Sequence, residues 1–434
     1  MDDKNIIKWK TFYQNGIDDM RLGKIENAIY NWMEAYEILP RKMENIYKLI
    51  NYYTTAAKHN IALHFYNIYK NTAKSSSGEE CSDEECSEDY DKDVYTFKCD
   101  YEYIIFAYYL KIKNINDQII SVLNNCGNPT LIINMFNNIK FYDLAIQAEK
   151  TVDLSFEFTK NINDVTYTFR SSTGCIVKKD DLYAMNIRIV NYYIHEKGHY
   201  IGCNPSLISI NKYIELDKTF SVVKEKEFDG KWDACDKIMG IEDIRLFNGK
   251  YIGAGYNSKN KIGILYGDYD IAKNRLEFTE LQSSFNDAYC EKNWVFVHYK
   301  KKTRIIYEWY PIKICNIEND KIIVTTEKPT PCVFKYIRGS TCGIDHNNEI
   351  WFVGHIVSVS ENPRNYYHIF IVFDQNMDLL RYSAPFKFSG KTIEYCIGLI
   401  FEDNKVILSY SEWDRTTKIS IYDEKYIESL LRYS

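Results

Sequence analysis

The segment GIEDIRLFNGKYIGAGY, residues 240–256, places a charged cluster directly before a β-hairpin pattern. Glu242, Asp243 and Arg245 fall within four positions, and short strand-like runs separated by a turn follow them. The packed face of a strand needs apolar side chains, not two acids beside a guanidinium. We therefore expect a strand-rich fold in which these charged positions either join neighbouring strands or face a polar site.

The same short-strand pattern extends over the rest of the C-terminal part of the chain. β-Branched and aromatic segments alternate with turn residues, as in TYTFRSS, LYAMNIRIVNYYI, RIIYEWYPIKI, IWFVGHIVSV and YHIFIVF. A polar motif followed by a hairpin recurs about every 50 residues, and five such units fit after about residue 165. The layout predicts a five-bladed β-propeller over residues 160–434, with a pair of β-sandwiches as the alternative.

The N-terminal part has a helical period with a specific spacing of small residues. Within residues 9–40 the spacing is formed by Gly16, Ala28, Trp32, Ala35 and Pro40. Small residues let two antiparallel helices approach closely, and proline ends the second helix. The pattern resembles a tetratricopeptide repeat, and Ala62 follows Ala28 at the 34-residue period of that family. We expect a tetratricopeptide-like helical domain over residues 1–150.

An acidic stretch interrupts the helical part. SSSGEECSDEECSEDYDKD has almost no apolar residues, so we expect a disordered loop over about residues 74–93. The loop is either a solvated spacer or a site of phosphorylation at Ser82 and Ser87, which precede acids. Residues 79–93 carry a charge of −8, and subtracting this from the total of −6 leaves +2. A nearly neutral remainder argues against a nucleic-acid partner.

Several common functions have no motif in this sequence. The twelve cysteines include no CxxC pair, which fits a reducing compartment, and no metal site is expected. No apolar run has the length of a membrane span, and the N-terminus has no signal-peptide pattern. No P-loop, no GxGxxG before a helix and no HExxH points to a cofactor. We expect a cytoplasmic protein without cofactor or membrane partner. Its richness in Asn, Ile, Lys and Tyr suggests a giant DNA virus or a protist as the source, and a viral protein of this kind belongs in the host cytoplasm or the virion.

Polar residues at equivalent places in successive propeller units would converge on one central funnel. The candidates, in order of the units, are Asn186 and Arg188, then Glu242, Asp243 and Arg245, then Glu291, Lys292 and Asn293, then Arg338, and finally Glu394 and Asp414. Asp and Arg at such places also form salt bridges that merely hold neighbouring blades together. The structural and the functional interpretation of the cluster both stay open.

The order of these motifs resembles a known enzyme family. NPSLI, IEDIRLF, EKNW, RGST, the YYH stretch at 366–368 and IEYCIGL with SYSEWDR are similar to glycoside hydrolase family 130 (GH130) and to the mannosyltransferase-phosphorylases of glycosyltransferase family 108. The resemblance implies a five-bladed propeller that acts on mannosides, with Asp243 as proton donor. It also implies that Glu242 and Arg245 are sugar-binding neighbours. Tyr367 is a candidate for stacking on a sugar face and His368 a candidate sugar contact, although most aromatics of so aromatic a chain and a histidine in a strand are commonly core residues.

Two departures from the family pattern bear on the reaction. Ile244 replaces the proline of the family's Glu-Asp-Pro-Arg motif, and the run from Trp309 to Pro311 replaces a His-Arg-Pro that helps to hold phosphate in the phosphorylases. Phosphorolysis is therefore disfavoured against hydrolysis or glycosyl transfer. An inverting mechanism uses a second carboxylate, and the candidates are Glu291, Glu394 and Asp414. An acid beside Arg245 is normally held ionised, which counts against Asp243 as donor unless burial raises its pKa.

The helical part resembles a module of sugar-active proteins as well. IYKLINYYTTAAKHNIALHFY and DVYTFKCDYEYIIFAYYL are similar to the tetratricopeptide modules attached to glycosyltransferases, which implies a protein partner. We expect the propeller to hydrolyse or transfer a mannoside-like unit of a carbohydrate or glycoconjugate. The alternative is a non-catalytic glycan-binding or protein-interaction scaffold. Carboxylates with shifted pKa values in one open pocket would favour an enzyme, and carboxylates each paired across blades would favour a scaffold.

Overall fold

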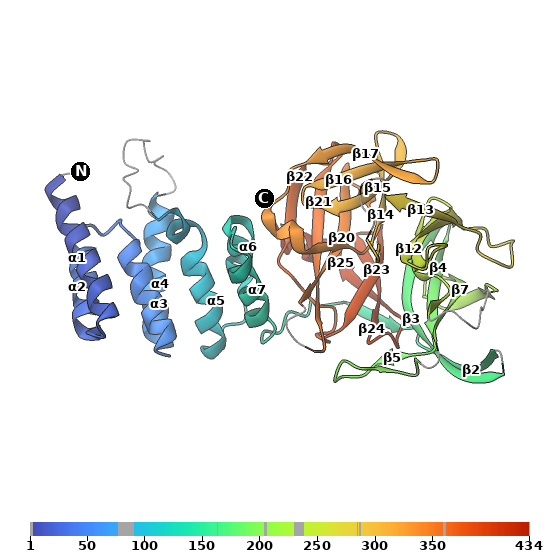
Figure 1. Ribbon diagram of the computed structural model, residues 1–434, viewed down its shortest axis with the longest axis horizontal. Helices are drawn as coiled ribbons and strands as arrows, with labels where there is room; N and C mark the ends of the chain where they lie inside the picture. Colours follow the sequence, from blue (N-terminus) through green and yellow to red (C-terminus); the bar gives the residue numbers. More distant parts are fainter. Residues whose placement is uncertain are drawn as a thin grey trace. The chain divides into compact units, whose positions relative to one another are not determined.

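The computed structural model describes residues 3–76, 91–162, 164–203, 206–229, 238–283, 285, 288–358 and 362–433. The chain forms two compact units, Met1–Asp143 and Leu144–Ser434, the first helical and the second largely β (Figure 1). The expected order of a helical region followed by a β region is confirmed. Most of the expected acidic loop, with Ser82 and Ser87, lies outside the described residues. None of the helices that the structure describes is both long and apolar enough to span a membrane.

The helical unit is a succession of antiparallel helices, whose bounds are α1 Asp3–Arg21, α2 Ile25–Ile38, α3 Glu44–Thr55, α4 His59–Ser76, a π-helical turn Val94–Lys98, α5 Cys99–Tyr109, α6 Asn116–Asn125 and α7 Pro129–Ile139. Helix α1 packs on α2, and α3 packs on α4. Ala28, Ala35 and Ala62 are fully buried in these contacts, and Trp32 fills the space beside Gly16. The small residues that predicted close helix packing therefore lie at the contacts, whereas the assignment to the tetratricopeptide family stays a prediction.

The first two groups of strands in the β unit follow the chain closely. One sheet has the order β2-β3-β4-β7-β8, with β9 pairing β7, and its strands are β2 Glu157–Ile162, β3 Val165–Lys179, β4 Leu182–Val190, β7 Leu207–Leu216, β8 Val222–Glu227 and β9 Ile238–Met239. A two-stranded ribbon, β5 Tyr193–Ile194 with β6 Tyr200–Ile201, projects between β4 and β7. The ribbon is bonded to Trp413, which precedes the candidate site residue Asp414.

The next sheet has eight strands in the order β10-β11-β12-β13-β17-β16-β15-β14. It consists of two antiparallel meanders joined where Gln282 and Ser283 pair in parallel with Lys321 and Ile322. The strands are β10 Glu242–Phe247, β11 Lys250–Tyr256, β12 Ile262–Asp268, β13 Thr279–Ser283, β14 Val295–Tyr299, β15 Lys302–Trp309, β16 Ile312–Glu318 and β17 Lys321–Lys328.

The last two sheets contain the C-terminal strands. One has the order β18-β20-β21-β22-β26 with β19 on β20, and its strands are β18 Ile337–Gly339, β19 Ile344–His346, β20 Glu349–Ser358, β21 Asn365–Asp374, β22 Leu379–Ser383 and β26 Leu431–Tyr433. The other has the order β1-β25-β24-β23, from β1 Lys150–Asp153, β23 Glu394–Glu402, β24 Lys405–Glu412 and β25 Lys418–Asp423. The 3₁₀ turn Cys332–Tyr336 precedes β18, and the short helix α8 Glu424–Ser429 precedes β26.

The boundary between the units lies earlier than the expected limits of 150 and 160. Helix α7 ends at Ile139, and the units divide between Asp143 and Leu144. The physical reason is that β1 pairs with β25, with Lys150 opposite Ile421, so the first strand of the β unit completes the sheet formed by its last residues.

Apolar clusters fill the spaces between neighbouring sheets. Ile187 of β4 packs in one cluster with Ile407 of β24, and Ala184 of β4 packs in another with Leu246 of β10. The β10–β13 and β14–β17 meanders share a third cluster through Ile264 and Phe296. Strand β23 contacts both β3 and β10, so the first strands of these sheets approach one another. Polar side chains of β3, β4 and β10 are thereby gathered in one place.

The hairpin at residues 242–256 forms as expected, but its first strand is irregular. Asn248 and Gly249, with φ of 49° and 74°, make the two-residue turn that a hairpin prefers. The pairing with β11 shifts between Glu242 and Arg245, which makes a β-bulge, and Asp243 has the left-handed φ of 51°. A bulge turns a side chain away from the direction that strict alternation would give it. Asp243 and Arg245 therefore do not simply share one face.

Candidate functional site

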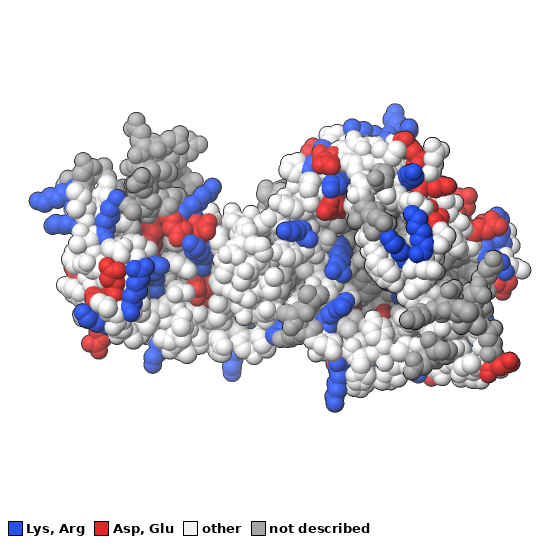
Figure 2. Space-filling view, in the orientation of Figure 1, with Lys and Arg blue, Asp and Glu red and all other residues white. Residues whose placement is uncertain are grey.

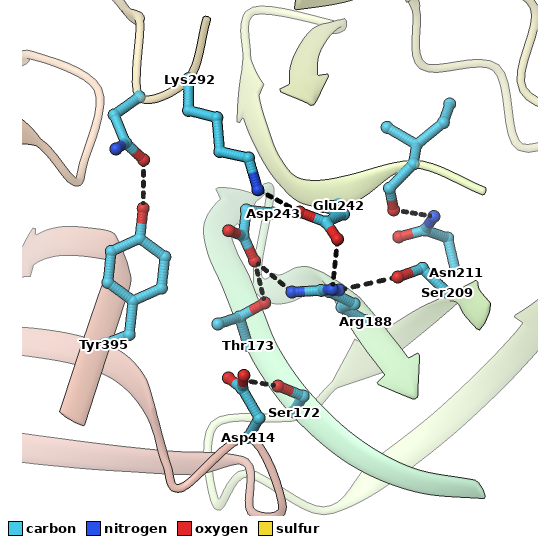
Figure 3. A network of polar contacts seen from close by, with 12 residues as sticks. Ser172, Thr173, Arg188, Ser209, Asn211, Glu242, Asp243, Lys292, Tyr395 and Asp414 are labelled. Carbon is cyan, nitrogen blue, oxygen red and sulfur yellow. Dashed lines mark hydrogen bonds and ion pairs between the residues drawn. The ribbon is translucent and has the colours of Figure 1, made fainter. Parts of the chain in front are cut away.

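The centre of the site is the buried guanidinium of Arg188, which β4 places between two acids (Figure 3). Its Nη1 lies 3.0 Å from Asp243 Oδ1, and its Nη2 lies 3.0 Å from Glu242 Oε1. The same group donates from Nε to Ser209 Oγ at 2.9 Å and from Nη2 to the Tyr192 hydroxyl at 2.8 Å. These contacts engage all three nitrogens of the guanidinium and fix its plane, so Arg188 holds the two carboxylates in place.

Asp243 is held as an ionised carboxylate. Thr173 Oγ1 donates to Asp243 Oδ1 at 2.9 Å, in addition to the ion pair with Arg188. Burial acts to raise the pKa of Asp243, but the positive charges of Arg188, Arg245 and Lys292 outweigh it, and the pKa lies below its ordinary value. The side chain keeps 16% of its surface exposed, so a ligand can reach it.

Asp414 lies beside the same cluster and has the opposite electrostatic behaviour. It follows Trp413 in a turn where both residues have left-handed φ, 54° and 51°. Ser172 Oγ donates to Asp414 Oδ1 at 3.3 Å. Burial raises the pKa of Asp414 to about 6, with Arg188 opposing the rise and the negative charges of Asp243 and Glu242 adding to it. Asp414 is therefore partly protonated near neutral pH while Asp243 is ionised.

Glu242 bridges Arg188 and a lysine from the next meander. Its Oε2 accepts from Lys292 Nζ at 2.7 Å, and its side chain is only 8% exposed. Lys292 remains one-third exposed. Glu242 thus serves mainly to position two cations, and Lys292 presents its ammonium group beside the carboxylates.

The Arg245 guanidinium bonds groups from three other segments of the chain. It donates from Nε to the Ser340 carbonyl at 2.6 Å and from Nη2 to the Tyr395 hydroxyl at 2.6 Å. Nη2 also lies 3.3 Å from Asn293 Oδ1, and Nη1 donates to the Asp243 carbonyl at 3.0 Å. Because these bonds occupy a residue that is only 2% exposed, Arg245 connects separate segments of the chain, and a sugar contact from it stays a prediction.

Glu291 lies apart from the pair, in a neighbouring cavity of about 450 Å³ that Lys292, Asn293, Trp309, Tyr310 and Arg338 also line. Trp294 Nε1 and the Tyr307 hydroxyl each donate to Glu291 at 3.2 Å. Burial raises the pKa of Glu291, and these two hydrogen bonds oppose the rise. Lys292 contacts both the cavity and Glu242, so the cavity adjoins the cluster. A separate, mostly apolar cavity of about 530 Å³ lies near the other end of β10, beside Phe247.

Four of the candidate site residues are buried in other roles. Glu394 is fully buried and accepts hydrogen bonds from the backbone amides of Phe388, Ser389 and Lys391, which makes it the cap of that turn. Asn186 is 1% exposed and bonds Asn211 and Tyr269. Tyr367 and His368 have no exposed surface, so neither can touch a ligand in this conformation. They pack in the sheet because strand alternation and burial, and not sequence adjacency, decide which side chains face the funnel.

The hydroxyl groups that complete the site are not among the residues predicted from the sequence. Ser172 and Thr173 hold the two aspartates, Tyr192 supports Arg188, and Tyr395 joins Arg245 to Asn293, whose Oδ1 lies 2.7 Å from the Tyr395 oxygen. In a chain with 38 tyrosines, no local pattern distinguishes those that reach the site. The described residues contain no group of three or more His, Cys, Asp or Glu arranged to hold a metal ion.

Charges of both signs are interspersed over the visible surface of each unit (Figure 2). On this face Lys and Arg do not gather into a single large basic patch. The cluster around Arg188 is buried, and its charged side chains come from separate segments of the chain (Figure 3).

Comparison with known proteins gives likenesses of fold alone. No protein-family model matches the chain, and no curated protein matches it. Among solved structures, a glycosyl hydrolase from Bacteroides ovatus is similar at 12% identity and a TM-score of 0.43, over 59% of this chain and 84% of that one. The β-1,2-mannobiose phosphorylase of Listeria innocua is similar at 10% identity and a TM-score of 0.42, over 64% of this chain and 99% of that one.

A third similar structure comes from the GH130 family of mannoside phosphorylases, which contains glycoside hydrolases that target β-1,2-mannosidic linkages in Candida mannan. The identity is 13% and the TM-score 0.42, over 59% of this chain and 84% of that one. At these values the likenesses do not assign an activity to this chain.

Proposed function

We propose that the β unit binds a carbohydrate over Asp243 and Asp414 and cleaves or transfers a glycosyl unit. The observation that carries the proposal is the pair itself: two partly exposed carboxyl groups beside one arginine, with pKa values displaced in opposite directions. Environments that push two titratable groups apart supply one acid and one base at the same pH. A purely structural salt bridge with Arg188 would need Asp243, but it would not need a second carboxyl group such as that of Asp414.

The geometry favours a different proton donor from the one that the family resemblance implies. Asp243 has a hydrogen bond and an ion pair that stabilise its charge, whereas the Asp414 carboxyl accepts a long hydrogen bond from Ser172 and, among the described residues, has no ion pair. We therefore assign the donor role to Asp414. Its proton passes to the glycosidic oxygen as the bond to the anomeric carbon breaks, and Asp243 takes a proton from the attacking water or acceptor hydroxyl.

Other charged residues of the β unit, its sheets and the helical unit have supporting roles in this proposal. Lys292, which is one-third exposed, stabilises negative charge on substrate oxygens, and Arg188 stabilises the charge on Asp243. The meanders, with the eight-stranded sheet counted as two, act as five blades around the site. The helical unit binds a protein partner, and Tyr30 and Met33 of α2, which are 60% and 40% exposed, offer apolar contacts for it.

A screen of glycans and aryl glycosides tests the proposal, with product analysis in the absence and presence of phosphate and of nucleotide sugars. It compares the wild type with Asp414→Asn, Asp243→Asn and the control Asp268→Asn, an exposed carboxyl group on β12. We expect the first two variants to lose turnover by about 100-fold or more while binding persists, and the control to match the wild type. Turnover by both site variants at the wild-type rate would reject the assignment.

One observation favours a second candidate, a non-catalytic glycan-binding scaffold. The ion pairs of Arg188 with Glu242 and Asp243 join β4 to β10, which is the kind of contact that holds neighbouring sheets together. The same screen separates the candidates. Sugar binding that depends on Asp243 and Asp414, with no product in any condition, would establish the scaffold.

A further inference from the structure

The mostly apolar cavity of about 530 Å³ lies further along the strands that form the candidate site. Strand β3 contributes Thr173 to the carboxylate cluster and Val177 to the cavity. Strand β10 contributes Asp243 to the cluster and Leu246 to the cavity. Between these two residues of β10, Ile244 is fully buried in an apolar cluster. The cavity is therefore separate from the site proposed above.

Side chains from each of the four larger sheets form the apolar walls of the cavity, among them Val177, Ala184, Leu246, Ile344, Leu399 and Phe401. Tyr213 and Tyr269 also line it, while their hydroxyl groups donate to Glu215 and Asn186. Folded interiors contain few voids larger than a water molecule, and ligand pockets have volumes of about 300–1,000 Å³. The cavity thus has the size and the walls of a binding site for an apolar molecule.

Among the described residues that line the cavity, the charged ones are all lysines, namely Lys178, Lys179 and Lys250. The side chain of each is at least 40% exposed, so the cavity reaches solvent. Each pairs with one carboxylate that does not line the cavity, from Glu402, Glu215 and Asp268 in that order. An ammonium group has three N–H donors. An anion in the cavity would therefore meet ammonium groups on its walls and not carboxylates.

The acid that pairs with Lys178 is shared with a second lysine. Glu402 lies 2.8 Å from Lys178 Nζ and 2.6 Å from Lys218 Nζ. Burial acts to raise the pKa of Glu402, but hydrogen bonds, chiefly from these two lysines, outweigh it and lower the pKa to about 2. Asp181 and Asp403 also act on Lys178, but both residues are exposed, where solvent and salt screen their charge. One ionised carboxylate between two ammonium groups leaves positive charge available at this edge of the cavity.

We propose that this cavity binds an apolar molecule with one anionic end, such as a medium-chain carboxylate. The hydrocarbon part packs among Leu246, Phe247 and Phe401, and the carboxylate accepts hydrogen bonds from Lys178 and Lys179. Removal of the hydrocarbon from water supplies most of the affinity, and the ammonium groups select the anion. A neutral molecule of the same length lacks the second contribution, and a cationic one is repelled.

Calorimetric titration of the full chain with four probes tests the proposal: octanoate, 1-octanol, octylammonium and acetate. We expect octanoate to bind at least about tenfold more tightly than octanol or octylammonium. Acetate lacks the hydrocarbon and should bind more than about 100-fold more weakly than octanoate. Because the cavity is separate from the carboxylate cluster, Asp414→Asn should bind octanoate as the wild type does, whether or not the protein acts on a sugar.

Variants of the two neighbouring lysines test the anionic end. Lys178→Met leaves Glu402 paired with Lys218, and Lys179→Met leaves Glu215 beside Lys224 at 3.8 Å, so neither change isolates a buried acid. The double variant should weaken octanoate binding by about tenfold and leave octanol binding within about twofold. Lys328→Met is the matched control, because Lys328 pairs with Asp378 and does not line the cavity, and it should change nothing.

A variant of the wall tests the position of the hydrocarbon. Ile271 lines the cavity from the loop after β12 and is partly exposed, and Ile271→Asp should weaken octanoate binding by about tenfold or more. Thermal unfolding of each variant shows whether a loss comes from misfolding. Equal binding of octanoate and octanol, or octanoate binding that neither the double lysine variant nor Ile271→Asp weakens, overturns the proposal. Failure of octanoate to bind also overturns it, and sedimentation of the protein with phosphatidylserine vesicles would then identify a membrane surface as the occupant.

Discussion

Ser172 and Thr173 are consecutive residues of β3, yet both face the same cluster, Ser172 bonding Asp414 and Thr173 bonding Asp243. Consecutive side chains of a regular strand point to opposite faces. Here the pairing of β3 with β4 shifts between Ser171 and Gly174, and this irregularity allows both hydroxyl groups to reach the site. A second irregularity, in β10, turns Asp243 towards Thr173. Two bulges therefore bring the two aspartates to neighbouring hydroxyl groups.

Asp414→Asn should stabilise the protein at alkaline pH. The pKa of Asp414 is about 6 in the folded chain, above its ordinary value of 3.8. The stability associated with its bound proton is fully present below about pH 4 and is lost as the pH rises through about 6. We expect the variant to exceed the wild type by about 2 kcal/mol at pH 8 and to match it at pH 4 in urea unfolding. A difference that does not change with pH would contradict the shifted pKa.

Arg188→Met should destabilise the β unit strongly. The change leaves Asp243 without its ion pair, and removing one partner of a buried pair costs about 3–5 kcal/mol. Lys250→Met is the matched control, because Lys250 pairs with Asp268 at the surface, where the side chains are 40% and 77% exposed. The control should lose less than about 1 kcal/mol. Denaturant unfolding followed by tryptophan fluorescence measures both, and similar losses would refute the central role of Arg188.

His368→Leu should make the protein less sensitive to acid. Neither ring nitrogen of His368 has a hydrogen-bond partner among the described residues, and burial lowers the pKa of His368 to about 3, with Lys387 adding to the effect. A neutral histidine in the fold contributes stability above about pH 6.5 that is lost as the pH falls towards about 3. At pH 5 the variant should lose about 1–2 kcal/mol less, relative to pH 7, than the wild type. Parallel pH profiles would show that His368 is solvated.

Gly16→Ala should destabilise the helical unit and leave the β unit unchanged. A Cβ atom at Gly16 would lie 2.4 Å from Trp32 Nε1, closer than real contacts allow. We expect a loss of about 1–3 kcal/mol from this overpacking. Gly127→Ala is the control, because no atom lies within 4 Å of its added Cβ. Helical circular dichroism on heating detects the loss, and equal melting of the two variants would contradict the close contact of α1 with α2.

Much of the architecture was accessible from the sequence, because hydrophobic period is a local property. The alternation in residues 165–434 predicted strands, and the spacing of Gly16, Ala28 and Trp32 predicted closely packed helices, as the structure confirms. Arg188, Glu242, Asp243 and Asp414 were all named as candidates from the starts of successive units. The pairing of β1 with β25, more than 250 residues away, is recorded by no local pattern of the sequence.

The sequence by itself thus determined the classes of element, their order and a set of charged positions from which a site could be built. Only the tertiary structure decided which of those positions meet. Arg245, two residues from Asp243, bonds Ser340 and Tyr395, whereas Asp414, far along the chain, lies beside Asp243's cluster. Whether a carboxyl group is an acid or a base here depends on burial and on the charges of Arg188 and Lys292, which come from other strands. Those quantities exist only once the sheets have packed together.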